Sequence, residues 1–406
     1  MQTSSKRMIK AMIPLFFGIA LLFVGNGLVV SSAGIELKKM GAGELETGLV
    51  ISVFFVGAML STIISHKIVS KVGHIRSFAI FSSIFGVCAM FHDLSQNLYL
   101  WALLRGGLGF CYYSILMIAE SWLNTRAKDQ IRSRVLAFYE VVFYSCFGLG
   151  ILILGFNLTS SQIFLISAAF ILLSSIPLNL NRIKEPPIPE KRSVSIPSIF
   201  SLVPLALITS IVAGVLVNGF FSMASIYILL QGYDAKEVSF FMTIAMVGGF
   251  IGHCVIGSLS DRFGRRPVII GCSVISLVAA IIFILFDAGI KLQYILSFFL
   301  GSGVFCLYAL ALARANDMLE YKSKSIEIGR AILFSYSLGS LFSPIIMGAT
   351  MYFFGPQGFI WVYVVLLISL IIFALTQKTI PIESRKSFEH SPGTIANVTV
   401  STKHKR

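Results

Sequence analysis

Twelve stretches of mainly apolar residues, each about 20 residues long, run through this chain and constrain its fold more than any other feature. A helix rises about 1.5 Å per residue, so about 20 residues cross the roughly 30 Å hydrocarbon core of a bilayer. Apolar residues make up 56% of the chain and charged residues only 12%, a balance that a soluble protein of 406 residues cannot bury. Open backbone has no partners in lipid, and barrel strands would alternate polar and apolar residues. The sequence therefore predicts an all-α membrane protein.

The predicted spans form two groups of six, separated by a polar connection rich in proline. We expect an N-terminal half at residues 1–180, a cytoplasmic linker at 181–202, a C-terminal half at 203–378 and a polar, basic tail at 379–406. With ends accurate to about 2 to 4 residues, the spans lie at about 10–33, 46–65, 77–92, 98–119, 135–155, 160–180, 203–228, 237–258, 268–287, 293–314, 329–353 and 358–377.

The net charge of +14 follows the predicted topology. With the amino terminus inside, 27 of the 32 Lys and Arg residues fall on the cytoplasmic side, four fall outside, and Arg105 lies within a span. This asymmetry predicts that both termini are cytoplasmic in a multi-pass protein of the inner membrane. The basic charge then indicates contact with anionic lipid headgroups, and no nucleic-acid partner is expected.

Two offsets relate the halves to each other. Moving the second half back by 195 residues aligns five positions near the fourth and tenth spans: Tyr99 with Tyr294, Gly106 with Gly301, Phe110 with Phe305, Cys111 with Cys306, and Tyr113 with Tyr308. An offset of 191 places the turn around Gly73 on the turn around Gly264. These matches predict an internal repeat.

A polar run, GSLSDRFGRRP, joins the eighth and ninth spans at residues 257–267. Together with twelve spans in two halves, it resembles the signature turn of the major facilitator superfamily. LLRGGLGF, IAESWLN and SYSLGSLFSP further resemble the YcaD-like branch of bacterial transporters. The resemblance implies twelve transmembrane helices in two six-helix pseudo-repeats around a central cavity. It also implies a cytoplasmic gate motif at Gly257, Asp261, Arg262, Gly264, Arg265 and Arg266.

The alternative for this run is a simple basic turn at the inner surface. In the first half the corresponding copy is degraded, because Ser70 stands where the motif has Asp and His66 where it has Gly. We therefore expect no symmetric latch, and a plain basic turn explains the first copy better.

Arg105 is the cation inside a predicted span. An arginine at the centre of a membrane helix costs at least about 3 kcal/mol unless it is paired or hydrated, so we expect it to face the cavity. The run from Arg105 to Gly109 also resembles the fourth-helix motif of the superfamily, whose arginine takes part in solute handling or proton coupling. The alternative is an arginine that holds helices together through backbone carbonyls.

Glu140 lies inside the fifth predicted span, where a carboxylate is costly and suited to carrying a proton. Tyr144 follows four residues later on the same helix face. A role in helix packing remains open for Glu140.

For Glu120 and Asp317, near the inner ends of their spans, we expect gate or surface ion pairs rather than coupling sites. His253 either bonds a neighbouring helix or titrates near neutral pH.

Other polar and aromatic residues complete the predicted cavity. Asn26 and Asn218 hold comparable places in the first and seventh spans, which line the cavity in this superfamily. The tyrosines that we add to them are Tyr112, Tyr113, Tyr227, Tyr308 and Tyr336. Such a pocket suits an organic solute, whereas the alternative for each residue is a polar contact between helices.

The predicted function is secondary active transport of a small organic solute by alternating access, coupled to protons. No P-loop, H-E-x-x-H pair or G-x-S-x-G elbow occurs, so we expect neither an enzyme nor direct drive by ATP. No cofactor or metal is expected, and the protein is predicted to be a monomer. Two alternatives remain: drug efflux by proton antiport, although the fifth span lacks the Gly-Pro motif of drug antiporters, and a receptor or scaffold, which needs no ionisable cavity.

Overall fold

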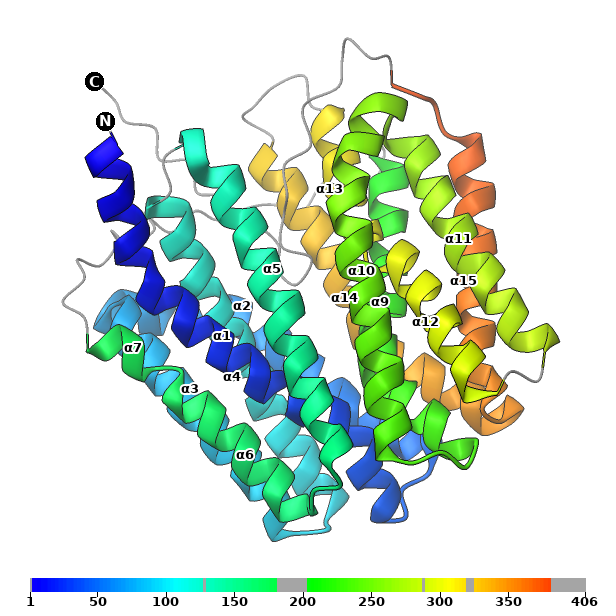
Figure 1. Ribbon diagram of the computed structural model, residues 1–406, viewed down its shortest axis with the longest axis horizontal. Coiled ribbons are helices and arrows are strands. Elements are labelled where there is room, and N and C mark those ends of the chain that lie inside the picture. Colours follow the sequence, from blue (N-terminus) through cyan, green and yellow to red (C-terminus); the bar gives the residue numbers. More distant parts are fainter. Residues whose placement is uncertain (1, 127–128, 181–202, 287–288, 319–324, 381–406) are drawn as a thin grey trace.

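The computed structural model describes residues 2–126, 129–180, 203–286, 289–318 and 325–380, which form helices and short turns (Figure 1). Within these ranges the elements are α1 (Gln2–Lys39), α2 (Glu44–Val72), α3 (His74–Phe91), η1 (His92–Leu94), α4 (Leu98–Arg126), α5 (Asp129–Ile153), η2 (Leu154–Phe156), α6 (Ser160–Leu173), α7 (Ile176–Asn179), α9 (Pro204–Leu230), α10 (Ala235–Phe263), α11 (Arg265–Leu285), α12 (Ile290–Val304), α13 (Leu307–Asp317), α14 (Ser325–Phe354) and α15 (Gln357–Thr376).

Twelve helical segments in the described ranges are long and apolar enough to cross a membrane. Two of them are interrupted: α6 continues into α7, and α12 continues into α13 after a tightened turn at Phe305 and Cys306. The prediction of an all-α membrane protein with twelve spans is confirmed. Several helices extend beyond the predicted spans, whereas α11 ends at Leu285, before the predicted 287. The first helix, α1, continues to Lys39, so that Lys38 and Lys39 form its last turn rather than a loop.

The two halves have the same internal arrangement. In the first half α2 packs on α4, α1 on α5, and α3 on α6; in the second, α10 packs on α12, α9 on α14, and α11 on α15. Figure 1 shows the first half in blue to green and the second in green to orange, side by side. The predicted six-helix repeats are therefore confirmed. The predicted linker at 181–202 and the tail from 381 onward lie outside the described residues.

Glycines at the turns repeat with the halves. Gly73 and Gly264, matched by the offset of 191, have φ of 87° and 96° and join α2 to α3 and α10 to α11. A second pair with the same offset, Gly41 and Gly232, has φ of 84° and 88°. Side chains disfavour these backbone angles, so glycine at both places lets each half make the same two reversals.

Glycines also bring helices within each half into close contact. A Cβ at Gly109 of α4 would overlap the carbonyl oxygen of Phe54 on α2, and one at Gly57 would overlap the carbonyl of Gly106. In the second half, Gly301 approaches the carbonyl of Ala245 in the same way. Small residues at helix interfaces let backbones approach where no hydrophobic force draws helices together in lipid.

The contacts that join the halves in the described residues lie from the middle of the bundle to the end where α1 finishes and α2 begins. There Gly48 packs on the backbone of Pro344, and Gly34 on Ser225. The Ser239 hydroxyl donates a hydrogen bond to the carbonyl of Ile151, 2.9 Å away. Toward the end where α1 begins and α15 finishes, the ribbons of the two halves diverge (Figure 1).

Substitution of Gly109 by alanine tests the close α2 and α4 packing. We expect Gly109→Ala to lower the free energy of unfolding by about 1 to 3 kcal/mol, because the new methyl group forces the two backbones apart. Thermal unfolding in detergent micelles measures the effect. Gly271→Ala is the matched control, since a Cβ there meets nothing within 4 Å. Equal unfolding temperatures for the two variants would contradict this packing role.

Candidate functional site

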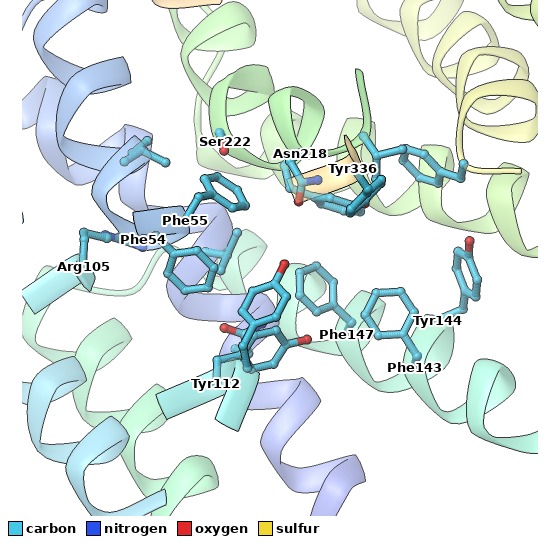
Figure 2. A pocket seen from close by; sticks show the side chains of 17 residues that line it. Phe54, Phe55, Arg105, Tyr112, Phe143, Tyr144, Phe147, Asn218, Ser222 and Tyr336 are labelled. Atoms are coloured by element: carbon cyan, nitrogen blue, oxygen red, sulfur yellow. The ribbon is translucent and has the colours of Figure 1, made fainter. Parts of the chain in front are cut away.

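A cavity lies between the two halves near the middle of the bundle (Figure 2). Its free volume is about 80 Å³, well below the roughly 300 to 1,000 Å³ of drug-sized ligand sites. Aromatic side chains dominate the wall, with a few polar groups between them. The lining residues are Asn26, Val30, Ile51, Phe54, Phe55, Arg105, Tyr112, Tyr113, Phe143, Tyr144, Phe147, Val217, Asn218, Phe221, Ser222, Phe305 and Tyr336.

Both halves contribute polar groups to opposite walls. In Figure 2 Tyr112 and Phe147 face Asn218 and Tyr336 across the cavity. Asn218 donates to the Ser340 hydroxyl at 2.7 Å and lies within hydrogen-bonding reach of Tyr336. Asn26, its counterpart on α1, lies within such reach of Tyr112, but its Oδ1 atom has no hydrogen-bond partner. The two asparagines thus both line the cavity wall, with different hydrogen bonding.

Arg105 reaches the cavity wall from α4 and is 1% exposed. Its Nη2 donates to the carbonyl of Val29 on α1 at 3.2 Å, and its guanidinium lies 5.8 Å from the ring centre of Trp101. Its Nε has no hydrogen-bond partner. The sequence analysis gave two interpretations of Arg105, a residue facing the cavity and a residue that holds helices together. Arg105 does both, because it links α4 to α1 and also lines the cavity.

Tyr144 connects the halves at the side of the cavity. Its hydroxyl lies 3.0 Å from Nδ1 of His253 on α10, which is also 3.1 Å from the carbonyl of Gly249 and 3.7 Å from Sγ of Cys306. In the neutral tautomer protonated at Nε2, Nδ1 accepts from the tyrosine; when Nδ1 carries a proton, it donates to the carbonyl. The protonation state of His253 therefore decides whether Nδ1 accepts a hydrogen bond from Tyr144 or donates one to the tyrosine oxygen or the Gly249 carbonyl.

Glu140 lies beside this contact and not on the cavity wall. It is buried one turn before Tyr144, close enough to Glu120 and Cys306 to interact electrostatically. Glu120 is buried as well, and its Oε1 has no hydrogen-bond partner. The structure thus brings together two carboxyl groups that the sequence analysis treated separately.

Two predicted cavity tyrosines lie elsewhere. Tyr227 packs inside the second half, with its ring stacked on Phe359 at 5.0 Å. Tyr308 stands behind the wall, 4.6 Å from the ring of Tyr336. Neither belongs to the lining residues, whereas Tyr112, Tyr113, Tyr144 and Tyr336 do.

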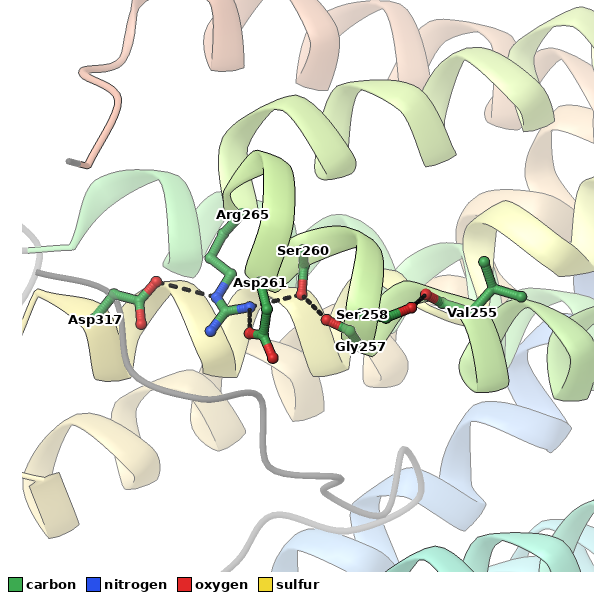
Figure 3. A network of polar contacts seen from close by, with 7 residues as sticks. All are labelled: Val255, Gly257, Ser258, Ser260, Asp261, Arg265 and Asp317. Atoms are coloured by element: carbon green, nitrogen blue, oxygen red, sulfur yellow. Dashed lines mark hydrogen bonds and ion pairs between the residues drawn. The ribbon is translucent and has the colours of Figure 1, made fainter. Parts of the chain in front are cut away.

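The gate motif forms a polar network at the end of α10 (Figure 3). Arg265 is buried at its centre: Nη1 donates to Asp261 and to Ser260, each at 2.6 Å, and Nε donates to Asp317 at 3.0 Å. Asp317 is as deeply buried as the arginine, whereas the Asp261 side chain is 43% exposed. The network ties α10, α11 and α13 together within the second half. The sequence analysis centred the motif on Asp261, but Arg265 makes most of these contacts.

The other motif residues complete this end of the molecule. Arg266 donates to the carbonyls of Ala374 and Leu375, each at 2.7 Å, and so caps the last turn of α15. Arg262 is exposed and lies 5.3 Å from the ring centre of Phe263. Gly257 is buried, and Gly264 makes the turn between α10 and α11.

A family model described as Major Facilitator Superfamily matches residues 15–328 and 232–401. The chain belongs to the major facilitator superfamily. It is therefore a multi-pass membrane transporter of the secondary type, and the family and fold imply a transporter rather than an enzyme. Among curated relatives, the uncharacterized transporter YcaD of Escherichia fergusonii is 25% identical over 335 residues, 81% of this chain and 86% of the relative. YcaD of Escherichia coli O6:K15:H31 is 26% identical over the same shares of the two chains.

Solved structures of major facilitator proteins share the fold. The nucleoside transporter NupG has a TM-score of 0.72 at 12% identity, with 90% of this chain and 97% of that chain covered. A bacterial homologue of the human lysosomal transporter Spinster, in an inward-facing and occupied conformation, has a TM-score of 0.69 at 15% identity, with 93% and 98% covered.

The sequence analysis missed the apolar part of this transporter's cavity. Phe54, Phe143, Phe147 and Phe221 line it, but in a chain with 35 phenylalanines nothing separates them from helix packing. Phe305 was recognisable in part, because it follows Gly301 and Gly303, which favour an irregular turn within a span. That turn separates α12 from α13.

We expect Arg265→Gln to lower the free energy of unfolding by about 3 to 5 kcal/mol, because the buried Asp317 carboxylate loses the guanidinium that is hydrogen-bonded to it. Denaturant unfolding in detergent micelles measures the change. The exposed Arg262 supplies a matched control, and Arg262→Gln is expected to stay within about 0.5 kcal/mol of the parent. Similar losses in both variants would show that the network is not the source of the stability.

Proposed function

We propose that this protein is a proton-coupled secondary transporter that moves a small organic solute through the central cavity by alternating access. The cavity itself carries this proposal: both halves line it, and it combines a buried guanidinium and amide groups with aromatic walls. A midplane site between repeats is where transporters of this architecture bind their solutes. A monomer is the proposed working unit, because transporters of this architecture bind their solute between the two repeats of one chain.

The proposed location is the inner membrane, with both termini in the cytoplasm, because Lys and Arg concentrate on that side.

Contacts between the halves lie in the middle and at the opposite end, at Gly34, Gly48 and Ser239. This conformation then corresponds to a state open toward the cytoplasm. Transport requires a second state, in which the cytoplasmic ends of the halves close and the contacts at Gly34 and Gly48 separate. In that state Asp261 and its arginines serve as the cytoplasmic latch.

Coupling to protons is assigned to the buried group formed by Glu140, Glu120, Tyr144 and His253. It lies where α5 of one half meets α10 of the other, so a proton bound there affects the contact between halves. Protonation at Nδ1 of His253 removes an acceptor for Tyr144. Protonation of Glu140 removes a buried negative charge beside the same contact. Either event changes the relative stability of the two states of the carrier.

Drug efflux remains the second candidate. Against it stands the cavity volume of about 80 Å³, which requires side chains to move before a drug-sized molecule fits. A receptor or scaffold would need no buried arginine at a cavity between repeats, since such a group is costly in a membrane.

Transport assays with purified protein in proteoliposomes test the function. A mixed metabolite pool is offered under an imposed proton gradient, and the accumulated solutes are identified by mass spectrometry. We expect accumulation that depends on the gradient. Glu140→Gln is expected to abolish the gradient dependence, and Arg105→Gln to reduce transport about 10- to 100-fold, because a charge-assisted hydrogen bond is lost.

Glu46→Gln serves as the matched control, since it neutralises an exposed carboxylate at the start of α2, far from Glu140 along the bundle. This variant should transport like the parent. Movement of no solute by the parent protein would contradict the proposed function. Gradient dependence that survives in Glu140→Gln would remove Glu140 from the coupling step.

A further inference from the structure

We propose that the cavity selects an organic anion, whose oxyanion group pairs with Arg105. This inference rests on the proposed function and adds the chemical class of the solute. It is carried by three observations at the cavity: its charge, its unused hydrogen-bonding capacity and its apolar walls.

The cavity carries a single formal charge in the described residues that line it, and this charge is positive. The side chain of Arg105 is 1% exposed, and no Asp or Glu oxygen in the described part of the chain lies within 4 Å of its guanidinium nitrogens. The ion pairs found in the described residues involve Lys39 and Arg265. A buried guanidinium without a protein counter-charge is strongly stabilised by an anionic ligand.

Hydrogen bonding points to the same chemistry. A guanidinium has five N–H donors in a planar fork, which matches the two oxygens of a carboxylate or the oxygens of a phosphate. Nη2 of Arg105 donates to Val29 on α1, whereas Nε has no partner although it is buried. The ring of Trp101 lies near the face of the guanidinium, so the N–H groups at the edge of the guanidinium remain able to bind other groups. An oxyanion supplies the acceptor that this edge lacks.

The other residues of the cavity wall indicate the chemistry of the rest of the solute. Oδ1 of Asn26 has no partner, so it is available to an O–H or N–H group of the solute. Phe54, Phe143 and Phe147 offer ring surfaces to an apolar or aromatic body. The volume of about 80 Å³ favours a small molecule in this conformation. A small aromatic or short aliphatic acid with a hydroxyl or amino group matches the positive charge, the free acceptor and the apolar walls.

An organic cation does not fit, because it would have to lie near a second positive charge in a site of low dielectric constant. Neutral solutes lack the charge that would compensate Arg105. We therefore expect carboxylates to bind at least about tenfold more tightly than amides or amines with the same skeleton, the ratio expected from one charge-assisted hydrogen bond.

The test is a matched series of ligands offered to the full chain in lipid nanodiscs. Benzoate, para-hydroxybenzoate and hexanoate represent the anions. Their carboxamides represent neutral molecules of the same shape, and benzamidine, para-hydroxybenzamidine and hexylamine represent the cations. Ligand-detected NMR measures binding of each compound. The parent protein alone tests the charge preference, so the result does not depend on whether any variant folds.

Variants then locate the preference. Arg105→Gln should lose the difference between carboxylate and amide, and Arg105→Lys, which keeps the charge, should retain part of it. Lys291→Gln removes an exposed cation outside the cavity and should bind like the parent. The proposal is overturned if the amides or cations bind as well as the anions, if no carboxylate binds, or if Arg105→Gln keeps the anion preference.

Proteoliposomes separate this proposal from the proposed function. Carboxylates that bind but do not cross the membrane, together with no movement of any other solute, would contradict transport and leave the anion site supported. Conversely, movement of cationic or neutral solutes in preference to anions would contradict the anion site and leave transport supported.

Discussion

Close approach of helix backbones is the constraint on which this architecture depends. Lipid tails are as apolar as leucine side chains, so helices in a membrane associate through packing rather than through a hydrophobic force. Within the halves, Gly57 and Gly109 let α2 and α4 meet, and Gly301 repeats the arrangement in α10 and α12. Between the halves, Gly48 lies close to the backbone of Pro344, and Gly34 lies close to the side chain of Ser225. Glycines at helix contacts therefore stabilise the packing within each half and also the interface between the halves.

The cavity lies where this packing stops, and its chemistry follows from its place in the membrane. Lipid offers no hydrogen-bond partner to a charge or amide there, so each polar group is satisfied by the protein, by water or by a bound solute. Asn218 finds protein partners, whereas Arg105 and Asn26 keep atoms without one. The Tyr144 and His253 contact joins the halves beside this cavity. The proposed solute site and the contact between the halves are thus adjacent, an arrangement that allows a bound solute to affect that contact.

The sequence was sufficient for the spans and the repeat, because hydropathy and turn glycines are local properties. It contained a further signal that was overlooked: Gly41 and Gly232 have the same offset of 191 as Gly73 and Gly264. Sequence also indicated Arg105, since an arginine in an apolar span is expensive. It did not separate Tyr227, which packs within one half, from the cavity tyrosines, because helix rotation decides which face a residue presents. Nor did it pair Arg265 with Asp317, 52 residues later, a contact that only the tertiary fold creates.

Rocking of the halves about the cavity is tested most directly by measuring distances at both ends of the bundle. Spin labels attached through a non-natural amino acid at the exposed positions 71 and 259 lie near the ends of α2 and α10 and report on one end of the bundle. Labels at the exposed positions 96 and 291 lie just before α4 and at the start of α12 and report on the opposite end. Alternating access predicts two populations in nanodiscs that interchange with pH and with added solute. In one of them the first distance shortens while the second lengthens. A single distance for each pair under all conditions, or changes of the same sign at both ends, would contradict rocking of the halves.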